Sequence, residues 1–102
     1  MKQVLTIVLS LVAFAAAAHQ EDVPITTAGE LRAWCEMESH ALFIGQGITP
    51  YNWSASYWDE GNVLFVEGSW RVGNKEAVIE CRIARGAQTR YAAMSIDGDE
   101  EE

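Results

Sequence analysis

Residues 63–85 have the sequence VLFVEGSWRVGNKEAVIECRIAR, and this stretch decides the fold. Apolar and polar residues alternate in both halves, which is typical of β-strands that bury one face. Gly73-Asn74 between the halves is a typical two-residue hairpin connection. We therefore predict antiparallel strands over 63–72 and 76–85. Their buried faces carry Leu64, Val66, Trp70 and Val72 on the first of these strands, and Ala77, Ile79, Cys81 and Ile83 on the second.

Two further strands flank this hairpin in the sequence. Residues 53–58 (WSASYW) alternate in the same way and are followed by a turn at 59–62. A turn at 86–88 leads into a fourth predicted strand over 89–96. Because short connections join neighbouring strands, we expect a four-stranded antiparallel meander with strand 53–58 at one edge.

A helix is predicted before the strands. Thr27 and Glu30 fit a capping box, in which the Thr27 hydroxyl accepts from the Glu30 amide and the Glu30 carboxylate accepts from the Thr27 amide. We expect the helix over 28–44, with Gly45 and Gly47 ending it. Apolar residues at three- and four-residue spacing define its buried face: Leu31, Trp34, Cys35, Ala41 and Leu42.

The chain has two cysteines, Cys35 in the predicted helix and Cys81 in the third predicted strand. An even number of cysteines in an exported chain predicts a disulfide, and closing a loop of this length stabilises a fold by about 4 kcal/mol. The bond would fix the helix across the concave side of the sheet. The predicted fold class is therefore α+β: one N-terminal helix packed on a four-stranded antiparallel β-meander and stapled by one disulfide.

Residues 1–18 have the pattern of a cleavable export signal. Lys2 is followed by an apolar run over 4–14, and Ala16 and Ala18 provide the small residues that a signal peptidase needs. The run is too short for a membrane anchor, which needs roughly 20 apolar residues. We expect export to the periplasm, with secretion as the alternative, and no membrane insertion after the signal is removed.

The remaining chain is divided into three expected parts. Residues 19–26 are an extended, mobile leader, residues 27–96 a single domain, and residues 97–102 a disordered acidic tail. With 15 acidic and 7 basic residues, the chain has a net charge of −8. Nucleic acids and anionic membranes bind basic surfaces, so neither is an expected partner. The acidity favours a protein partner with a basic surface.

Glu38 is the candidate acid for chemistry. It lies between Cys35 and Leu42 on the predicted buried face, where a carboxylate is costly unless it is paired. As a functional group it would be a buried acid that faces a ligand or substrate. The structural alternatives are an ion pair with an arginine of the sheet, or a helix rotated so that Glu38 lies at its rim.

Aromatic residues are denser around the first strand than a small core requires. We therefore expect exposed rings that contact a protein or a glycan. Alternation places Trp53 and Tyr57 on one face of strand 53–58 and Trp58 on the other. The alternative is a rim of rings that closes the ends of the core. The candidate binding residues are Tyr51, Trp53, Tyr57 and Phe65.

Charged side chains are predicted on the outward face of the two central strands. Arg71 and Arg82 share this face with Glu67 and Glu80. We expect cross-strand ion pairs among them on a solvated surface.

We predict no cofactor and no metal. Two widely separated cysteines without a nearby histidine make a poor zinc site. A copper site at a histidine N-terminus would need His19 and a second histidine held by the fold, and His40 is expected on the solvent side of the helix. The spacing indicates neither a nucleophile elbow nor a Ser-His-Asp arrangement.

These patterns leave two classes of function open. The first is a non-enzymatic binding or accessory module, of the inhibitor or immunity type, acting through an acidic surface that bears aromatic rings. The second is a small ligand-binding or catalytic domain that uses Glu38 between helix and sheet. A domain of this size has little room for such a pocket, so we favour the first. A dimer formed by strand 53–58 and its copy stays open.

Overall fold

The structure is a computed structural model and describes residues 22–97. The predicted signal at 1–18, His19 and residues 98–102 of the predicted tail lie outside the described residues. Within 22–97, no helix is both long enough and apolar enough to cross a membrane.

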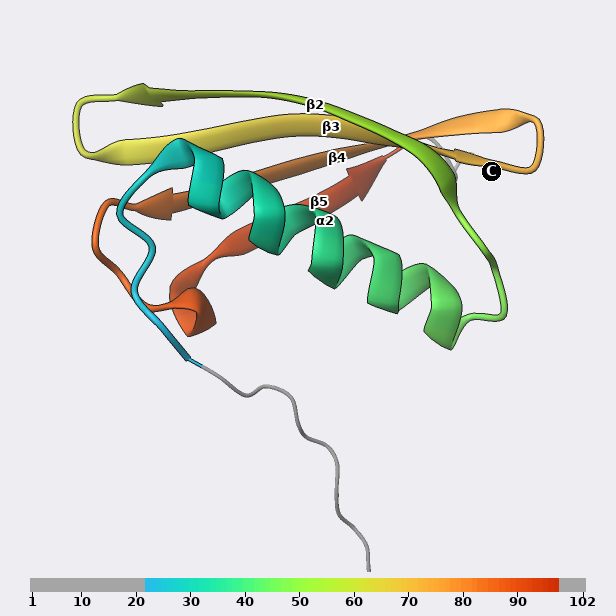
Figure 1. The fold of residues 1–102 in the computed structure, drawn as a ribbon, viewed down its shortest axis with the longest axis horizontal. Coiled ribbons are helices and arrows are strands. Elements are labelled where there is room, and N and C mark those ends of the chain that lie inside the picture. Colours follow the sequence, from blue (N-terminus) through green and yellow to red (C-terminus); the bar gives the residue numbers. More distant parts are fainter. Residues whose placement is uncertain (1–21, 98–102) are drawn as a thin grey trace, which may run out of the picture.

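One face of a four-stranded sheet is crossed by helix α2 (Ala28–Gly45), as Figure 1 shows. The strands lie in chain order, β2-β3-β4-β5, and each neighbouring pair is antiparallel. The predicted α+β meander is thus confirmed, with β2 at one edge of the sheet. The strands are β2 (Tyr51–Glu60), β3 (Val63–Val72), β4 (Lys75–Ala84) and β5 (Ala93–Asp97).

Two tight hairpins join the three long strands. Gly61-Asn62 connects β2 to β3, and the predicted Gly73-Asn74 connects β3 to β4. Gly61 and Gly73 have φ values of 60° and 63°. Two-residue hairpin turns require such left-handed backbone, and glycine adopts it without steric cost.

The capping box at the start of α2 is confirmed. The Glu30 amide donates to Thr27 Oγ1 over 3.1 Å, and the Thr27 amide donates back to Glu30 Oε1 over 3.3 Å. A shorter bond, 2.8 Å, joins the Thr26 amide to the same carboxylate oxygen. These bonds satisfy amides that a helix start leaves without partners, so they fix where α2 begins.

The buried face of α2 differs from the predicted one. Ala41 and Leu42 were expected on it, but both are exposed, and Trp34 is half-buried. The helix instead contacts the sheet along a single row at four-residue spacing. Because that row includes a serine, a search for apolar residues misses it. The buried residues of the row are Leu31, Cys35, Ser39 and Phe43.

Ser39 is buried without losing its hydrogen bonds. Its Oγ accepts from Trp70 Nε1 of β3 over 2.9 Å and donates to the Cys35 carbonyl over 2.7 Å. A buried polar group is tolerated when it is paired in this way. The serine therefore links the middle of the helix to the sheet.

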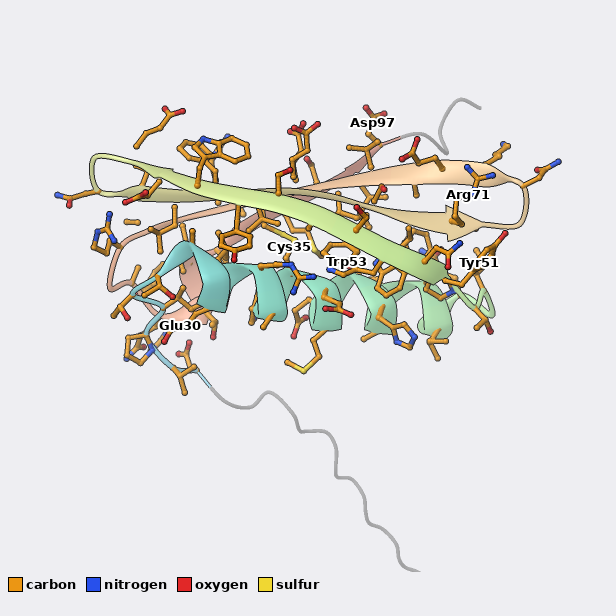
Figure 2. The ribbon with its side chains drawn as sticks, turned by 45° about the horizontal axis from the view of Figure 1, so that its top comes forward. Glu30, Cys35, Tyr51, Trp53, Arg71 and Asp97 are labelled. Carbon is orange, nitrogen blue, oxygen red and sulfur yellow. A yellow bond between two sulfur atoms is a disulfide. The ribbon has the colours of Figure 1, made fainter. Side chains whose placement is uncertain are left out.

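The Cys35–Cys81 disulfide is present, with 6.2 Å between the two Cα atoms. Figure 2 shows Cys35 between the helix and the sheet. The bond fixes the centre of α2 to β4, as predicted. A disulfide is consistent with an oxidising, exported environment.

The described part of the leader, residues 22–26, is extended and docked. Ile25 is buried, its amide donates to the Ala87 carbonyl over 3.0 Å, and the Gly86 amide donates to the Ile25 carbonyl over 2.7 Å. The packed unit therefore begins before residue 27.

The same docking changes the predicted fourth strand. Residues Thr89–Tyr91 form a 3-10 turn, and the strand begins at Ala93. The Thr89 amide donates to the Val23 carbonyl and the Arg90 amide to Asp22 Oδ1, both over 3.0 Å. These amides are bound to the leader, and the chain pairs with β4 only beyond them.

Candidate functional site

The sheet has a second face, which no helix covers within residues 22–97. In Figure 2, Trp53 and Cys35 lie between sheet and helix, whereas Asp97 lies on the opposite side. We call this second side the open face. Its centre consists of three rows of residues that are paired across the strands. From β2 to β5 the rows are Trp58, Phe65, Arg82 and Ala93, then Ser56, Glu67, Glu80 and Ser95, then Ser54, Ser69, Val78 and Asp97.

The first row begins with a pair of stacked rings. Trp58 and Phe65 are direct cross-strand partners, with ring centroids 5.5 Å apart and planes inclined by 14°. Trp58 is 39% exposed, and its Nε1 donates to Glu60 Oε2 over 3.0 Å. The indole is thus held in place by the Phe65 ring of β3 and by the Glu60 carboxylate of its own strand, β2. This is a preformed aromatic surface.

The second row places two acidic residues side by side. Glu67 and Glu80 are direct cross-strand partners, and both are exposed. Neither forms an ion pair with any residue of 22–97. The expected pairing with Arg71 and Arg82 does not occur, because the register sets Arg82 opposite Phe65 and Arg71 opposite Glu76. Like charges in directly opposite positions destabilise a sheet.

A hollow of about 310 Å³ joins these two rows. Its walls include Trp58 and Phe65 at one end and Glu67 and Glu80 at the other, with Arg82 along the side. A second hollow of about 200 Å³ lies beside it, and serines of β2 and β3 line it together with Glu67. The open face therefore offers both an aromatic and an acidic contact in one concave region.

The structure does not bring the four predicted binding residues together. Phe65 lies on the open face, where Trp58, absent from the predicted set, is its partner. Tyr57 lies on the helix side, where a Cβ at Gly29 would contact its ring.

Tyr51 stands at the far end of β2, and its hydroxyl donates to the Gly73 carbonyl over 2.6 Å. Strand alternation in the sequence already placed Trp58 and Tyr57 on opposite faces of their strand. The strand register that pairs Trp58 with Phe65 was the missing information.

Trp53 is half-buried and packs against the core on the helix side of the sheet. Strand alternation places Trp53 on the helix side of the sheet, together with Tyr57, and a β-bulge between Tyr51 and Ser54, with Asn52 at φ 57°, interrupts this alternation toward Tyr51. Its ring lies 5.0 Å from that of Trp70 and covers Gly68, where a Cβ would overlap it. The Trp53 Nε1 is buried and has no hydrogen-bond partner among the described residues.

The prediction of a buried acid at position 38 is wrong. Glu38 is exposed, and the neighbouring Ser39 occupies the place that faces the sheet. The rotation of α2 onto its four-residue row moves Glu38 to the rim. The two hollows described above lie on the open face, away from the helix.

Residues 22–97 contain no group of three or more histidine, cysteine or acidic side chains placed to hold a metal ion. Comparisons with protein families, with curated proteins and with solved structures give no match to this chain. The interpretation of the open face therefore depends on its own geometry and charge.

Proposed function

We propose that this protein is an exported, non-enzymatic binding module whose open face binds a basic protein partner. The observation that carries the proposal is the Trp58–Phe65 stack, which adjoins the facing pair Glu67 and Glu80 in one hollow. Rings anchor a contact by burying area, and charges select the partner. Both are present within two rows of the sheet.

The charge of the open face supports a basic partner. Acidic residues outnumber arginines there, and the whole chain carries a net charge of −8. A surface of one sign steers an oppositely charged protein and raises its association rate. The outward acidic residues are Glu60, Glu67, Glu76, Glu80 and Asp97, and the outward arginines are Arg71 and Arg82.

The rings support binding because they are held before a partner arrives. Trp58 is stacked on Phe65 and bonded to Glu60, so little side-chain freedom is lost when the pair is covered. Tryptophan is among the residues most enriched at the energetic centres of protein interfaces. An inhibitor or immunity-type protein, which works by covering a partner's surface, is the kind of module that fits.

The site of action we propose is the periplasm. The signal pattern over 1–18 predicts cleavage before His19, and a Cys35–Cys81 disulfide suits an oxidising compartment. Mass spectrometry of the protein recovered from cells should find a chain that begins at His19 and lacks free thiols. A full-length chain retained in the cytoplasm would contradict export.

Site-specific photo-crosslinking in cells that produce the protein tests the binding proposal. A photoreactive amino acid replaces Ser56, which is exposed on the open face, or Met37, which is exposed on the helix. We expect a defined adduct with a basic protein from position 56 and none from position 37. High salt during crosslinking in extracts should reduce the adduct, because screening weakens steering between exposed charges.

Two outcomes of the crosslinking would overturn the proposal. An adduct from position 37 and none from position 56 would place the contact on the helix. No adduct from either position, in protein that circular dichroism shows to be folded, would exclude a binding role for the open face.

A further inference from the structure

We propose that the hollow of the open face holds a single arginine side chain of the partner, with its guanidinium between Glu67 and Glu80 and its methylene stem against Trp58 and Phe65. The inference depends on the proposed function, because it specifies what the basic partner inserts. It concerns the hollow of about 310 Å³ and not the open face as a whole.

The two carboxylates of the hollow favour a cation as its occupant. Directly opposite residues of an antiparallel pair have Cβ atoms roughly 5 Å apart, so the Glu67 and Glu80 carboxylates flank one point on the sheet. A cation at that point turns a repulsive pair into two attractive contacts. A guanidinium suits this place because its planar fork donates to two carboxylates at once.

The two rings of the hollow favour an apolar stem beside that cation, because apolar groups pack on aromatic surfaces. The Trp58–Phe65 row and the Glu67–Glu80 row are two residues apart along β3, which is roughly 7 Å in a strand. An arginine side chain bridges such a gap, with its methylenes on the rings and its charged end beyond them. A guanidinium at the margin of an indole also gains from the ring electrons.

The volume fits a side chain better than a larger ligand. Pockets for small molecules begin at roughly 300 Å³ and bury most of the ligand. The hollow reaches the lower limit, and it lies on an open sheet surface. It is suited to one residue that projects from a protein surface lying across the sheet.

Arg82 provides a way to distinguish a cationic occupant from an anionic one. It lines the same hollow, but it forms no ion pair with Glu67 or Glu80. For an arginine guest, Arg82 is a neighbouring positive charge that weakens the attraction. For an anionic guest, such as a carboxylate or an acidic glycan, Arg82 would be the main attractive group.

The test is an NMR titration of the ¹⁵N-labelled chain, residues 19–102, at low salt. The probe is the pentapeptide Gly-Gly-Arg-Gly-Gly with blocked ends. The matched control peptide has citrulline, which has the shape of arginine without its charge. We expect saturable shifts of the Trp58 indole N–H and of the Glu67 and Glu80 amides, with an affinity at least about tenfold higher than for citrulline.

Variants of the hollow sharpen the result. Glu67→Gln and Glu80→Gln should each weaken the arginine peptide about fivefold or more, and Arg82→Gln should strengthen it. Glu38→Gln, an exposed carboxylate change on the helix, should leave it unchanged. Circular dichroism shows that each variant is folded.

Equal binding of the two peptides would overturn the inference, and so would weaker binding in Arg82→Gln. If the arginine peptide fails while position 56 still crosslinks to a basic protein, this inference alone fails. If position 56 gives no adduct, the proposed function fails.

Discussion

Glu67 and Glu80 face each other directly across β3 and β4, and no arginine or lysine of residues 22–97 forms an ion pair with either. The sheet therefore contains a repulsion that a single amide would remove. We predict that Glu80→Gln raises the free energy of unfolding by about 0.2–1 kcal/mol at low salt. Urea unfolding, followed by circular dichroism, measures the change.

The matched control for this prediction is Glu76→Gln. Glu76 lies on the same strand and face, but it is opposite Arg71. Its replacement should give no gain in stability. Salt should shrink the gain from Glu80→Gln, since exposed charges are screened. A loss of stability in Glu80→Gln would contradict the prediction. A gain would identify a site where stability is given up, as is common where a surface binds.

The Ser39–Trp70 hydrogen bond gives a second prediction. Ser39→Ala leaves the buried Trp70 N–H without its acceptor, so unfolding should become easier by about 1–3 kcal/mol. Ser54→Ala changes an exposed serine of the open face and should stay within about 0.5 kcal/mol of wild type. Urea unfolding at neutral pH compares the two. Equal stability of both variants would show that the bond contributes nothing.

Local sequence signals predicted the elements that depend on neighbouring residues. The Gly73-Asn74 hairpin, strand 63–72 and the Thr27–Glu30 capping box match the structure. Each depends on residues that are close in the chain, where alternation and turn chemistry act directly. The Cys35–Cys81 bond was predicted as well, because two cysteines allow one pairing.

The misassigned residues depend on contacts between distant parts of the chain. Ser39 is buried because Trp70 donates to it, and hydropathy alone does not reveal such a pair. Trp53 was expected to contact a partner, but its ring packs on Trp70 of the next strand. The start of β5 is delayed by hydrogen bonds to the leader. The arrangement of the open face could not be predicted without the register between strands, which places Glu67 directly opposite Glu80.

The disulfide should contribute a large share of the stability. The cysteines are 46 positions apart, and the chain-entropy model gives about 4 kcal/mol for a loop of this size. Replacing both cysteines by alanine should lower the free energy of unfolding by about that amount, and reduction of the native protein should lower its melting temperature strongly. An unchanged melting temperature after complete reduction would contradict this prediction. Mass spectrometry after thiol labelling checks that reduction is complete.

The acid limit of stability should depend on Glu30 and Asp59. Hydrogen bonds from the Thr26 amide and then the Thr26 hydroxyl lower the pKa of Glu30 from its ordinary value of 4.5. The hydrogen bond from Arg85, 2.7 Å long, is the main cause that lowers the pKa of Asp59 from 3.8. Both folded-state pKa values lie below the unfolded ones. The two carboxylates therefore stabilise the fold at pH values above their pKa in the unfolded chain. This stabilisation is lost as the pH falls through their pKa in the folded protein.

Melting temperatures measured from pH 7 to pH 2 test this dependence. Glu30→Gln and Asp59→Asn should melt below wild type at neutral pH and approach it at acidic pH, where the wild-type carboxyls are protonated. Glu38→Gln is the control, because the Glu38 carboxylate is exposed and forms no ion pair within residues 22–97, and this variant should follow wild type throughout. A constant gap between wild type and either test variant at every pH would refute the linkage.

The last prediction separates rings that bind from rings that hold the fold together. Trp58 and Tyr57 are adjacent, but they lie on opposite faces of β2. Trp58→Ala should weaken partner binding by about 2 kcal/mol or more with the fold intact, whereas Tyr57→Ala should leave binding nearly unchanged even though Tyr57 is the more exposed ring, at 52%. Trp53→Ala should instead cost about 3–5 kcal/mol of stability, because its ring packs on Trp70 and Gly68. Calorimetry with the purified, unmodified form of the partner that crosslinking identifies measures binding, and urea unfolding measures stability. If Tyr57→Ala loses binding and Trp58→Ala retains it, the prediction is wrong. The partner would then contact the helix side of the sheet, at the ring that is more exposed.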